Sequence, residues 1–344
     1  MSAAAWPTVG VAGARGVVGG VFLSILADAG LPAGSLRAFG TDAGSVAYGG
    51  STLPVRVLDE AMAAELDVLF LATDGPISRE IVAGPGRVVP LIIDNSSAFR
   101  LDPDVPLIVP EANGTVLDSY RGNLVANPNC TTAAAVVALA PIRDLAGLEA
   151  VDLASYQAVS GAGRAGLDAF EAERAAGGTD RADASPFHGR IADNVVPQID
   201  TLDDDGWTGE ERKVMAELRK ILGLPELDVS ATTVRVPVHT GHSVVLHVRT
   251  RREVTLGEVA EALAEAPGVE YRDASGSDRH PMPLDVAGRD PVLVGRLRAI
   301  PGRPRGLALF LSSDNLRKGA ALNALQVAAR ANPDRFGRLV PSSR

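Results

Sequence analysis

Glycines at every third position near the start of the chain constrain the fold more than any other feature. An apolar run of strand type, residues 8–13, leads directly into an apolar stretch of helical type, residues 17–26. The glycines that recur across this junction are Gly10, Gly13, Gly16 and Gly19. Glycine there permits a tight strand-to-helix turn and a close approach of the backbone to a pyrophosphate, which the helix N-terminus attracts. A tight turn alone would explain these glycines, but their position at the start of a βαβ-like pattern favours a dinucleotide-binding site.

Short apolar runs, separated by turn-rich or helix-like stretches, continue through the first 130 residues. They lie at residues 36–39, 68–72, 91–94, 107–109 and 124–126. Runs of this kind are typical of parallel strands that are buried on both faces of a sheet. We therefore predict an α/β protein whose N-terminal part is a doubly wound, Rossmann-type domain.

The pattern changes after residue 148. Residues 151–160 and 229–251 alternate in polarity and are rich in Val and Thr, which predicts extended antiparallel strands. Between them, residues 208–222 carry apolar side chains at helical spacing, and the segment 174–196 is polar and Gly-rich. We predict a helix for the former, and we expect the latter to cover a surface or a subunit contact.

Composition limits the class of protein and its partners. The chain has a formal net charge of −9 and its basic residues are spread out, so neither nucleic acid nor an anionic membrane is expected as a partner. No apolar run reaches the ~18–20 residues of a membrane span, and residues 1–7 lack the basic start of a signal peptide. A single cysteine rules out an internal disulfide. We therefore expect a cytoplasmic protein.

That single cysteine, Cys130, is the strongest candidate for a reactive group, although a lone cysteine is usually a small buried hydrophobe. It follows a predicted strand and a Pro-Asn turn, and it opens the Ala- and Val-rich stretch 131–139, which is predicted to be helical. The N-terminus of a helix favours a thiolate through its dipole and its unsatisfied N–H groups. The same N–H groups can hold an oxyanion when a thiolate attacks a carbonyl.

A cysteine nucleophile also needs a group that accepts and donates protons. His239 and His242 both lie in the segment 235–243, and spacing alone brings neither of them close to Cys130. The residues themselves therefore leave the choice between the two histidines open.

The segment around the cysteine, Asn-Pro-Asn-Cys-Thr-Thr at residues 127–132, resembles the nucleophile motif of the aspartate-semialdehyde dehydrogenases. Six further segments resemble parts of the same family and occur in the family's order. They are residues 94–100, 109–111, 156–163, 194–200, 235–242 and 313–320. By these motifs the chain is identified as a member of that family.

The resemblance implies a role for each matching residue. Cys130 is implied as the nucleophile, His242 rather than His239 as the general acid/base, and Gln157 as the residue that orients the substrate and its thioester. The implied substrate ligands are Arg235 for the α-carboxylate, Glu217 for the α-ammonium, Arg100 and Lys220 for the phosphate, and Asn129. Without the family, Glu217 and Lys220 would be interpreted as an exposed salt bridge on one face of a helix.

The resemblance also implies a nicotinamide cofactor and no metal. The implied cofactor ligands are Gly13, Arg15, Gly16, Val17, Val18, Thr41, Asp42, Asn95, Ser160, Gly161 and Asn315. In the implied reversible reaction, Cys130 attacks L-aspartyl-4-phosphate, phosphate leaves, and a nicotinamide hydride reduces the thioester to L-aspartate 4-semialdehyde. This reaction belongs to the biosynthesis of diaminopimelate, lysine, threonine and methionine.

The architecture of the family implies two domains. Residues 1–129 with 319–344 are expected to form the dinucleotide-binding domain, onto which the C-terminal helix packs back. Residues 130–318 are expected to form an α+β catalytic and dimerisation domain with a mixed or antiparallel sheet. A homodimer or a homotetramer is implied.

The cofactor segments depart from the family pattern. In the glycine loop the family has a small hydroxyl side chain where this chain has Arg15. After the second strand the family often has Ala-Arg-Ser, and the arginine of that segment pairs with the 2′-phosphate of NADP. This chain has Gly-Thr-Asp at residues 40–42, and Asp74 adds a carboxylate in the next loop. An acidic side chain repels a 2′-phosphate and accepts a hydrogen bond from a ribose hydroxyl. We expect NADP, bound in a shifted manner, with NAD as the alternative.

Two other functions stay open at this point. The first is reduction of a related acyl phosphate such as N-acetyl-γ-glutamyl phosphate, although the cysteine motif of that family differs and Glu217 argues for a free amino group. The second is a specialised paralogue with altered cofactor binding or no turnover. The altered cofactor segments argue for this second function, and the intact catalytic set argues against it.

Overall fold

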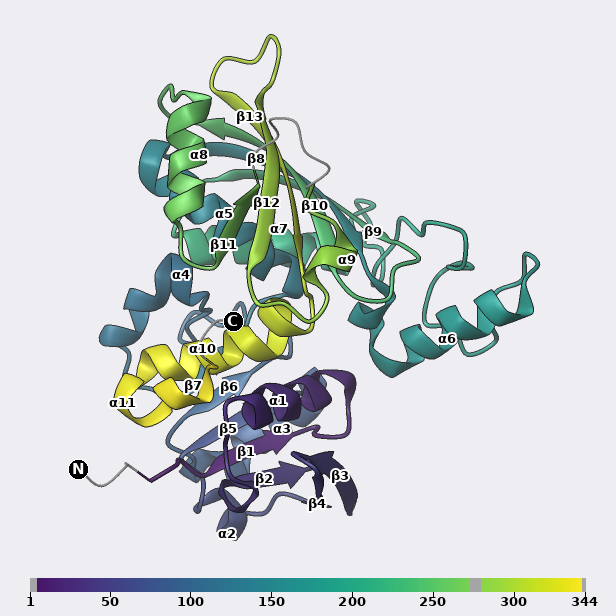
Figure 1. Ribbon diagram of the computed structural model, residues 1–344, viewed down its shortest axis with the longest axis vertical. Helices are drawn as coiled ribbons and strands as arrows, with labels where there is room; N and C mark the ends of the chain where they lie inside the picture. The colour runs from purple at the N-terminus through teal and green to yellow at the C-terminus, as the bar shows by residue number, and fades with distance from the viewer. Residues whose placement is uncertain (1–4, 273–279, 342–344) are drawn as a thin grey trace. The chain divides into compact units, whose positions relative to one another are not determined.

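The computed structural model describes residues 5–272 and 280–341 (Figure 1). The chain forms two compact units, one from the residues up to Pro128 together with those from Ala320 onward, and the other from Asn129–Gly319. Residues 1–4 of the segment assessed for a signal peptide lie outside the described residues. Within the described ranges, no helix is long and apolar enough to cross a membrane.

The first unit contains a seven-stranded sheet in the order β3-β4-β2-β1-β5-β6-β7. Its strands are β1 (Val9–Ala12), β2 (Leu36–Phe39), β3 (Gly44–Tyr48), β4 (Ser51–Arg56), β5 (Val68–Leu71), β6 (Ile92–Asp94) and β7 (Leu124–Ala126). Neighbouring strands are parallel except in the edge hairpin β3–β4. The strand order extends from β1 in both directions, so the predicted doubly wound α/β fold is confirmed.

Two features of this sheet differ from the prediction. The hairpin β3–β4 was not predicted, because its mostly exposed residues lack the apolar run of a buried strand. The run 107–109 is not a strand: Leu107 forms an isolated bridge with Ala126, and the N–H of Val109 donates to the side chain of Asn113 at 3.0 Å. This run is apolar because it is buried, not because it extends the sheet.

Helices cover this sheet and complete its core (Figure 1). They are α1 (Val17–Asp28), α2 (Glu60–Ala63), α3 (Gly75–Ala83), α4 (Pro110–Asn113), α10 (Leu322–Ala331) and α11 (Pro333–Phe336), with 3₁₀ segments at Ala33–Ser35, Pro85–Val88, Gly114–Asp118 and Gly337–Leu339. Phe22 of α1 and Leu325 of α10 join the same core cluster as Phe70 and Val125 of the sheet. The C-terminal helix α10 is therefore part of the hydrophobic core of the first unit.

The second unit contains a six-stranded mixed sheet in the order β11-β12-β13-β10-β8-β9, whose strands are labelled in Figure 1. Its strands are β8 (Leu148–Gln157), β9 (Asp228–Arg235), β10 (His242–Thr250), β11 (Val269–Arg272), β12 (Val292–Ala299) and β13 (Gly306–Ser313). The prediction of antiparallel strands holds for β10 but is wrong for the pair β8–β9, which is parallel. The long crossover 158–227 returns the chain in the same direction, as parallel pairing requires.

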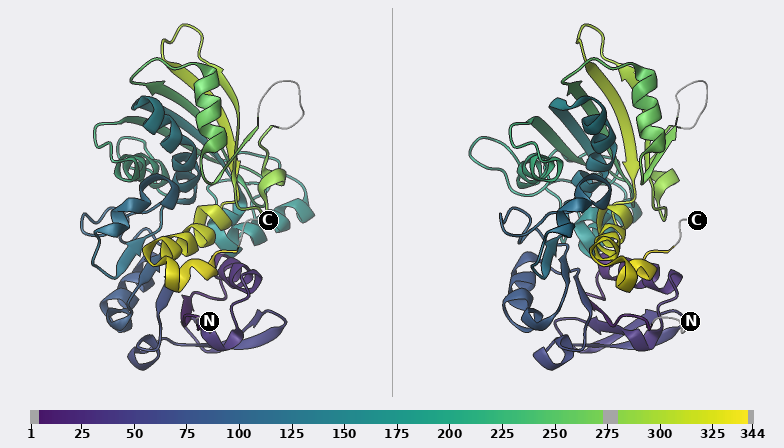
Figure 2. Two further views of the ribbon diagram at one scale, coloured as in Figure 1. Left: turned by 60° about the vertical axis from the view of Figure 1, so that its left-hand side comes forward. Right: turned by 90° about the vertical axis from the view of Figure 1, so that its left-hand side faces the viewer.

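Most helices of the second unit contact its sheet. The helices of this unit are α5 (Cys130–Ala146), α6 (Gly163–Ala176), α7 (Gly209–Leu222), α8 (Leu256–Glu265) and α9 (Pro283–Val286), with a 3₁₀ segment at Val159–Ala162 and a π-helical turn at Arg317–Ala321. The helix predicted over 208–222 is present as α7, and it begins with a capping box between Thr208 and Glu211. α5 contacts β8, β10, β12 and β13, so it lies across the middle of the sheet (Figure 2).

Candidate active site

Cys130 is the first residue of α5, as the sequence predicted, and the preceding Asn129 caps the helix. The side-chain oxygen of Asn129 accepts hydrogen bonds from the N–H groups of Thr131 at 2.9 Å and Thr132 at 3.2 Å. The expectation that these helix N–H groups are available for an oxyanion is therefore wrong for Thr131 and Thr132. The positive end of the helix still faces the thiol.

His242 lies at the start of β10, and its Nε2 is 3.2 Å from the Sγ of Cys130. The other ring nitrogen, Nδ1, accepts a hydrogen bond from the N–H of Ala158 at 3.0 Å. In the neutral ring an accepting Nδ1 leaves the proton on Nε2, the atom that faces the sulfur. Burial, and then the charge of Arg235, hold the pKa of His242 well below its ordinary value of 6.5. The resting ring is therefore a neutral donor to the sulfur.

The structure brings His242, and not His239, to the cysteine. His239 is half exposed, lies 2.7 Å from the carboxylate of Glu171 and contacts the ring of Phe170 edge-on. The turn that precedes His242 is held by Asn315, whose side-chain oxygen accepts from the N–H of Gly241 at 2.9 Å. The fold thus settles a choice that spacing left open.

A second buried group beside the cysteine is Glu210, which the sequence analysis did not select. One of its oxygens accepts from the amide of Asn129 at 2.8 Å and from the amide of Gln157 at 3.2 Å. Its other oxygen lies 3.6 Å from the ammonium of Lys213. Glu210 thus connects the helix cap, the predicted substrate-orienting amide and a lysine.

Arg235 lies at the end of β9 and is only 5% exposed. Its Nη1 donates to the carbonyl of Ala158 at 2.8 Å, and its guanidinium lies 5.8 Å from the ring centre of Phe187. Burial lowers the pKa of Arg235, while the negative charges of Glu210 and Cys130 oppose that shift. Its buried Nε finds no hydrogen-bond partner within the residues that the structure describes. An unsatisfied buried guanidinium N–H is suited to an anionic ligand.

Glu217 and Lys220 lie farther along α7 than Glu210. Glu217 is 1% exposed and accepts from the backbone N–H of Asn129 at 2.6 Å, so it supports the turn that precedes the nucleophile. Lys220 follows Glu210 by ten residues, about 15 Å of helix, and lies in the last turn of α7. The spacing Glu-x-x-Lys occurs twice on α7, at 210–213 and at 217–220. That repeat is the signal in the sequence that points to Glu210, but it does not decide between the two pairs.

Arg100 and Asn95 belong to the first unit. The guanidinium of Arg100 donates to the carbonyl of Asn127 at 2.9 Å and to that of Asn95 at 2.7 Å, so it is fixed to the backbone that follows β6 and β7. The amide of Asn95 donates to the carbonyl of Leu71 at 2.9 Å. In the second unit, the predicted cofactor ligands Ser160 and Asn315 hydrogen-bond to each other at 2.9 Å.

The glycine loop between β1 and α1 has a shape that fits a dinucleotide. Gly13 has φ +78°, and a Cβ on it would lie 2.2 Å from the carbonyl oxygen of Ala72. A Cβ on Gly19 would lie 2.2 Å from the carbonyl oxygen of Gly13, so α1 packs directly on the loop. A cavity of about 590 Å³ borders Gly13 and Gly16, the residue that precedes α1. Because the glycines leave no side chain in front of it, the N-terminus of α1 is suited to bind a pyrophosphate. Val17 and Val18 are the first residues of that helix.

Comparison with known proteins gives the same assignment for both units. A family model described as "Semialdehyde dehydrogenase, NAD binding domain" matches residues 8–120, and one described as "Semialdehyde dehydrogenase, dimerisation domain" matches residues 139–318. The aspartate-semialdehyde dehydrogenase of Streptomyces akiyoshiensis is 42% identical over 340 residues, which cover 93% of this chain and 97% of the relative. That of Aquifex aeolicus is 38% identical over 327 residues, which cover 93% and 96%.

Solved structures agree with these relatives. The crystal structure of aspartate semialdehyde dehydrogenase II from Vibrio cholerae has a TM-score of 0.89 and 35% identity, and the match covers 96% of this chain and 100% of that one. Another crystal structure of that enzyme, described as complexed with ASA, has a TM-score of 0.89 and 34% identity, with 97% and 100% coverage. The chain belongs to the aspartate-semialdehyde dehydrogenase family, as its motifs indicated.

Proposed function

We propose that the chain catalyses the reversible reductive dephosphorylation of L-aspartyl-4-phosphate to L-aspartate 4-semialdehyde with a nicotinamide cofactor. The observation that carries this proposal is the 3.2 Å contact between Cys130 Sγ and His242 Nε2 at the N-terminus of α5. Its relatives are named aspartate-semialdehyde dehydrogenases, which supports this reaction over the reduction of N-acetyl-γ-glutamyl phosphate.

The buried charges around Cys130 match an amino acid. Arg235, with its unsatisfied Nε–H, is suited to the α-carboxylate. For the α-ammonium we propose Glu210 in place of Glu217, because Glu210 lies against Gln157 and exerts its charge on Arg235. Glu217 instead holds the backbone of Asn129. Two opposite charges beside the nucleophile select a zwitterionic substrate.

His242 acts as a hydrogen-bond donor. Because Nδ1 accepts from Ala158, Nε2 already carries a proton in the neutral ring and stabilises the thiolate of Cys130. The thiolate forms a bond to the acyl carbon, the bond from that carbon to the phosphate oxygen breaks, and a Cys130 thioester remains. Gln157 orients the acyl group, while the His242 Nε2–H donates to the acyl oxygen as it gains charge. A reduced nicotinamide, when bound, would supply a hydride to the thioester carbon; the C–S bond to Cys130 would then break, which releases the aldehyde and restores the thiolate.

For the phosphate we propose Arg100, Asn129 and a lysine of α7. We favour Lys213, whose ammonium pairs with Asp200 at 2.7 Å and lies 3.6 Å from Glu210, over Lys220, which lies one turn beyond Glu217. The remaining proposed cofactor ligands are Gly13, Gly16, Val17 and Val18 at the helix N-terminus, with Asn95, Thr41, Ser160, Gly161 and Asn315. The resemblance to the family favours NADP as the cofactor, and NAD is the alternative.

Self-association is proposed through the sheet face of the second unit that lies opposite α5. Side chains of this face are partly or largely exposed, and strand pairing places Ala154 beside Val245 and Tyr156 beside Val234. Tyr156 is 41% exposed. The same face also carries Asp152, Thr232 and His247. A sheet face of mixed polarity that none of the described helices covers fits a homodimer or homotetramer, and the family model for this unit is described as a dimerisation domain.

One assay tests the reaction and its ligands. The protein is incubated with aspartate semialdehyde, phosphate and either NADP or NAD, and formation of the reduced nicotinamide is followed by absorbance. We expect turnover with at least one cofactor and none after Cys130→Ala. Activity with N-acetylglutamate semialdehyde alone, or none with either substrate, would contradict the proposal.

Matched variants in the same assay distinguish the repeated Glu-x-x-Lys pairs. Glu210→Gln should raise KM for aspartate semialdehyde by about 10- to 100-fold, the loss of one charge-assisted hydrogen bond. Glu217→Gln should mainly lower kcat, because it disturbs the turn before Cys130. Lys213→Ala should raise KM for phosphate more than Lys220→Ala does. The reverse order in either pair would restore the assignment made from the motif.

A further inference from the structure

The glycine loop and the loop after β2 are joined by an ion pair. Arg15 extends from the glycine loop and its guanidinium pairs with the carboxylate of Asp42. A Cβ on Gly44 would lie 3.1 Å from Nη1 of Arg15, and a Cβ on Gly40 would lie 3.5 Å from Nη2. Arg15 therefore lies along residues 40–44, in the loop that receives the adenosine ribose in doubly wound folds.

Asp42 is an ionised acceptor in this arrangement. Its Oδ1 accepts from Arg15 and, at 3.0 Å, from the hydroxyl of Thr41. The hydrogen bond from Arg15, and then that from Thr41, lower the pKa of Asp42 below its ordinary value of 3.8. Its Oδ2 accepts no hydrogen bond from the residues that the structure describes, which leaves that oxygen for a ligand hydroxyl.

The charges around the cavity are unfavourable for a phosphate. Among the described residues that line it, Arg15 is the one cationic side chain, whereas Asp74 and Glu80 are carboxylates. The single cation is already engaged by Asp42. A 2′-phosphate, which adds nearly two negative charges, would have to displace Asp42 from Arg15 and then stand beside that carboxylate. A 2′-hydroxyl would donate to Asp42 and leave the ion pair intact.

We infer that the Arg15–Asp42 pair makes this site select the cofactor with a free adenosine 2′-hydroxyl, NAD(H), over NADP(H). Arg15 positions Asp42 and does not bind a phosphate itself. The inference rests on the proposed function only in that the dinucleotide binds at the glycine loop. It differs from the family-based expectation of NADP.

The test measures binding, separately from turnover. NADH and NADPH are titrated into the full-length protein by nicotinamide fluorescence, and ADP-ribose and its 2′-phosphate by calorimetry. We expect the dissociation constant of NADH to be at least about tenfold lower than that of NADPH. Asp42→Ser should release Arg15 and shift the ratio toward NADPH by about tenfold or more. The double variant Arg15→Ala/Asp42→Ser should lose that gain.

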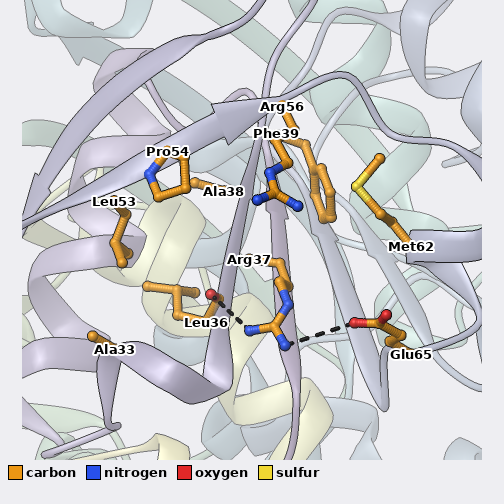
Figure 3. Close-up of a pocket in the computed structure, with 10 residues that line it drawn as sticks. All are labelled: Ala33, Leu36, Arg37, Ala38, Phe39, Leu53, Pro54, Arg56, Met62 and Glu65. Carbon is orange, nitrogen blue, oxygen red and sulfur yellow. Dashed lines mark hydrogen bonds and ion pairs between the residues drawn. The ribbon is translucent and has the colours of Figure 1, made fainter.

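A second exposed ion pair in the same unit provides the control. Arg37 and Glu65 lie 3.6 Å apart at a separate cavity of about 330 Å³, which includes neither Arg15 nor Asp42 in its lining (Figure 3). Glu65→Ser removes a carboxylate from the same unit and should leave the NADH-to-NADPH ratio unchanged.

The outcomes separate the inference from the proposed reaction. Tighter binding of NADPH by the unmodified protein, or an unchanged ratio in Asp42→Ser, would overturn the inference. Selective binding of NADH without turnover of aspartate semialdehyde would contradict the proposed reaction and support the inferred preference for NADH. Failure of all four probes to bind would overturn both.

Discussion

The residues around Cys130 and the Arg15–Asp42 pair differ in the number of contacts that hold each functional side chain in position. His242 and Gln157 are each 1% exposed; both ring nitrogens of His242 have a partner, and the amide nitrogen of Gln157 donates to both Ser155 and Glu210. The side chains of Arg15 and Asp42 are 41% and 66% exposed, and chiefly one contact holds them. Chemistry at the cysteine therefore depends on several groups at once, whereas cofactor choice depends on one exposed pair that a single substitution can alter.

Replacing one glycine in each region should show this difference most strongly. A Cβ on Gly161 would lie 2.6 Å from Nη1 of Arg235 and 3.3 Å from the ring of His242, both buried. Gly161→Ala should lower kcat/KM by about 100-fold or more, because ångström displacements of positioned groups cost that much. A Cβ on Gly44 would meet only the exposed end of Arg15, so Gly44→Ala should change turnover less than about threefold. Steady-state kinetics on both variants, with circular dichroism as a check of folding, test this. Equal losses of kcat/KM in the two variants would show that the two regions are equally constrained.

Proton uptake on unfolding should distinguish the two regions next. The folded state holds the pKa of His242 well below 6.5, so the unfolded state binds the extra proton and stability falls as pH decreases below that value. The expected slope is about 1.4 kcal/mol per pH unit. It should appear between pH 6.5 and 5 and disappear in His242→Gln. Because the pKa of Asp42 is lowered from 3.8, its contribution is lost only at more acidic pH, and Asp42→Asn should leave that slope unchanged.

The measurement can be confined to the second unit. Trp207 lies in that unit and Trp6 in the other, so urea unfolding of a Trp6→Phe background followed by tryptophan fluorescence reports on the unit that contains His242. A slope that survives His242→Gln would assign the proton uptake to another group.

Salt should have the smallest effect, and only at the exposed pair. Raising ionic strength from 0.05 to 0.5 M shortens the screening length to about 4 Å. The preference for NADH over NADPH should then shrink by about two- to threefold, because the carboxylates repel a 2′-phosphate less. Fluorescence titrations at both salt concentrations test this. A preference for NADH that grows at high salt would instead show that Arg15 binds the 2′-phosphate, because the pyrophosphate is common to both cofactors.

Local signals in the sequence predicted much of the fold. The strand–glycine–helix junction and the start of α5 at Cys130 were predicted because each is determined by residues within a few positions of it. The parallel pairing of β8 and β9 was not predicted, since strand direction is set by the 158–227 crossover and not by the residues in the strands.

A residue of the candidate site could be predicted from the sequence only where no other residue of the same type lies nearby in the chain. His239 and His242 are indistinguishable until the fold places one of them beside the sulfur. Glu210 was not predicted because α7 repeats the same Glu-x-x-Lys spacing two turns later, and that spacing does not distinguish the two pairs. The N–H groups at the start of α5 were expected to receive an oxyanion, but the side chain of Asn129 accepts from two of them, those of Thr131 and Thr132. Each of these outcomes depends on a contact rather than on a residue type.

The contribution of α10 to the first core has a consequence for how the chain is made. Leu322, Leu325 and Val327 pack with Phe22 and Phe70, yet residues 129–319 are synthesised between them. At 5–20 residues per second, that delay is roughly 10 to 40 s. During this interval the nascent first unit lacks its last helix and exposes the apolar surface that α10 later covers. The unit that is translated first is therefore the last to complete its core.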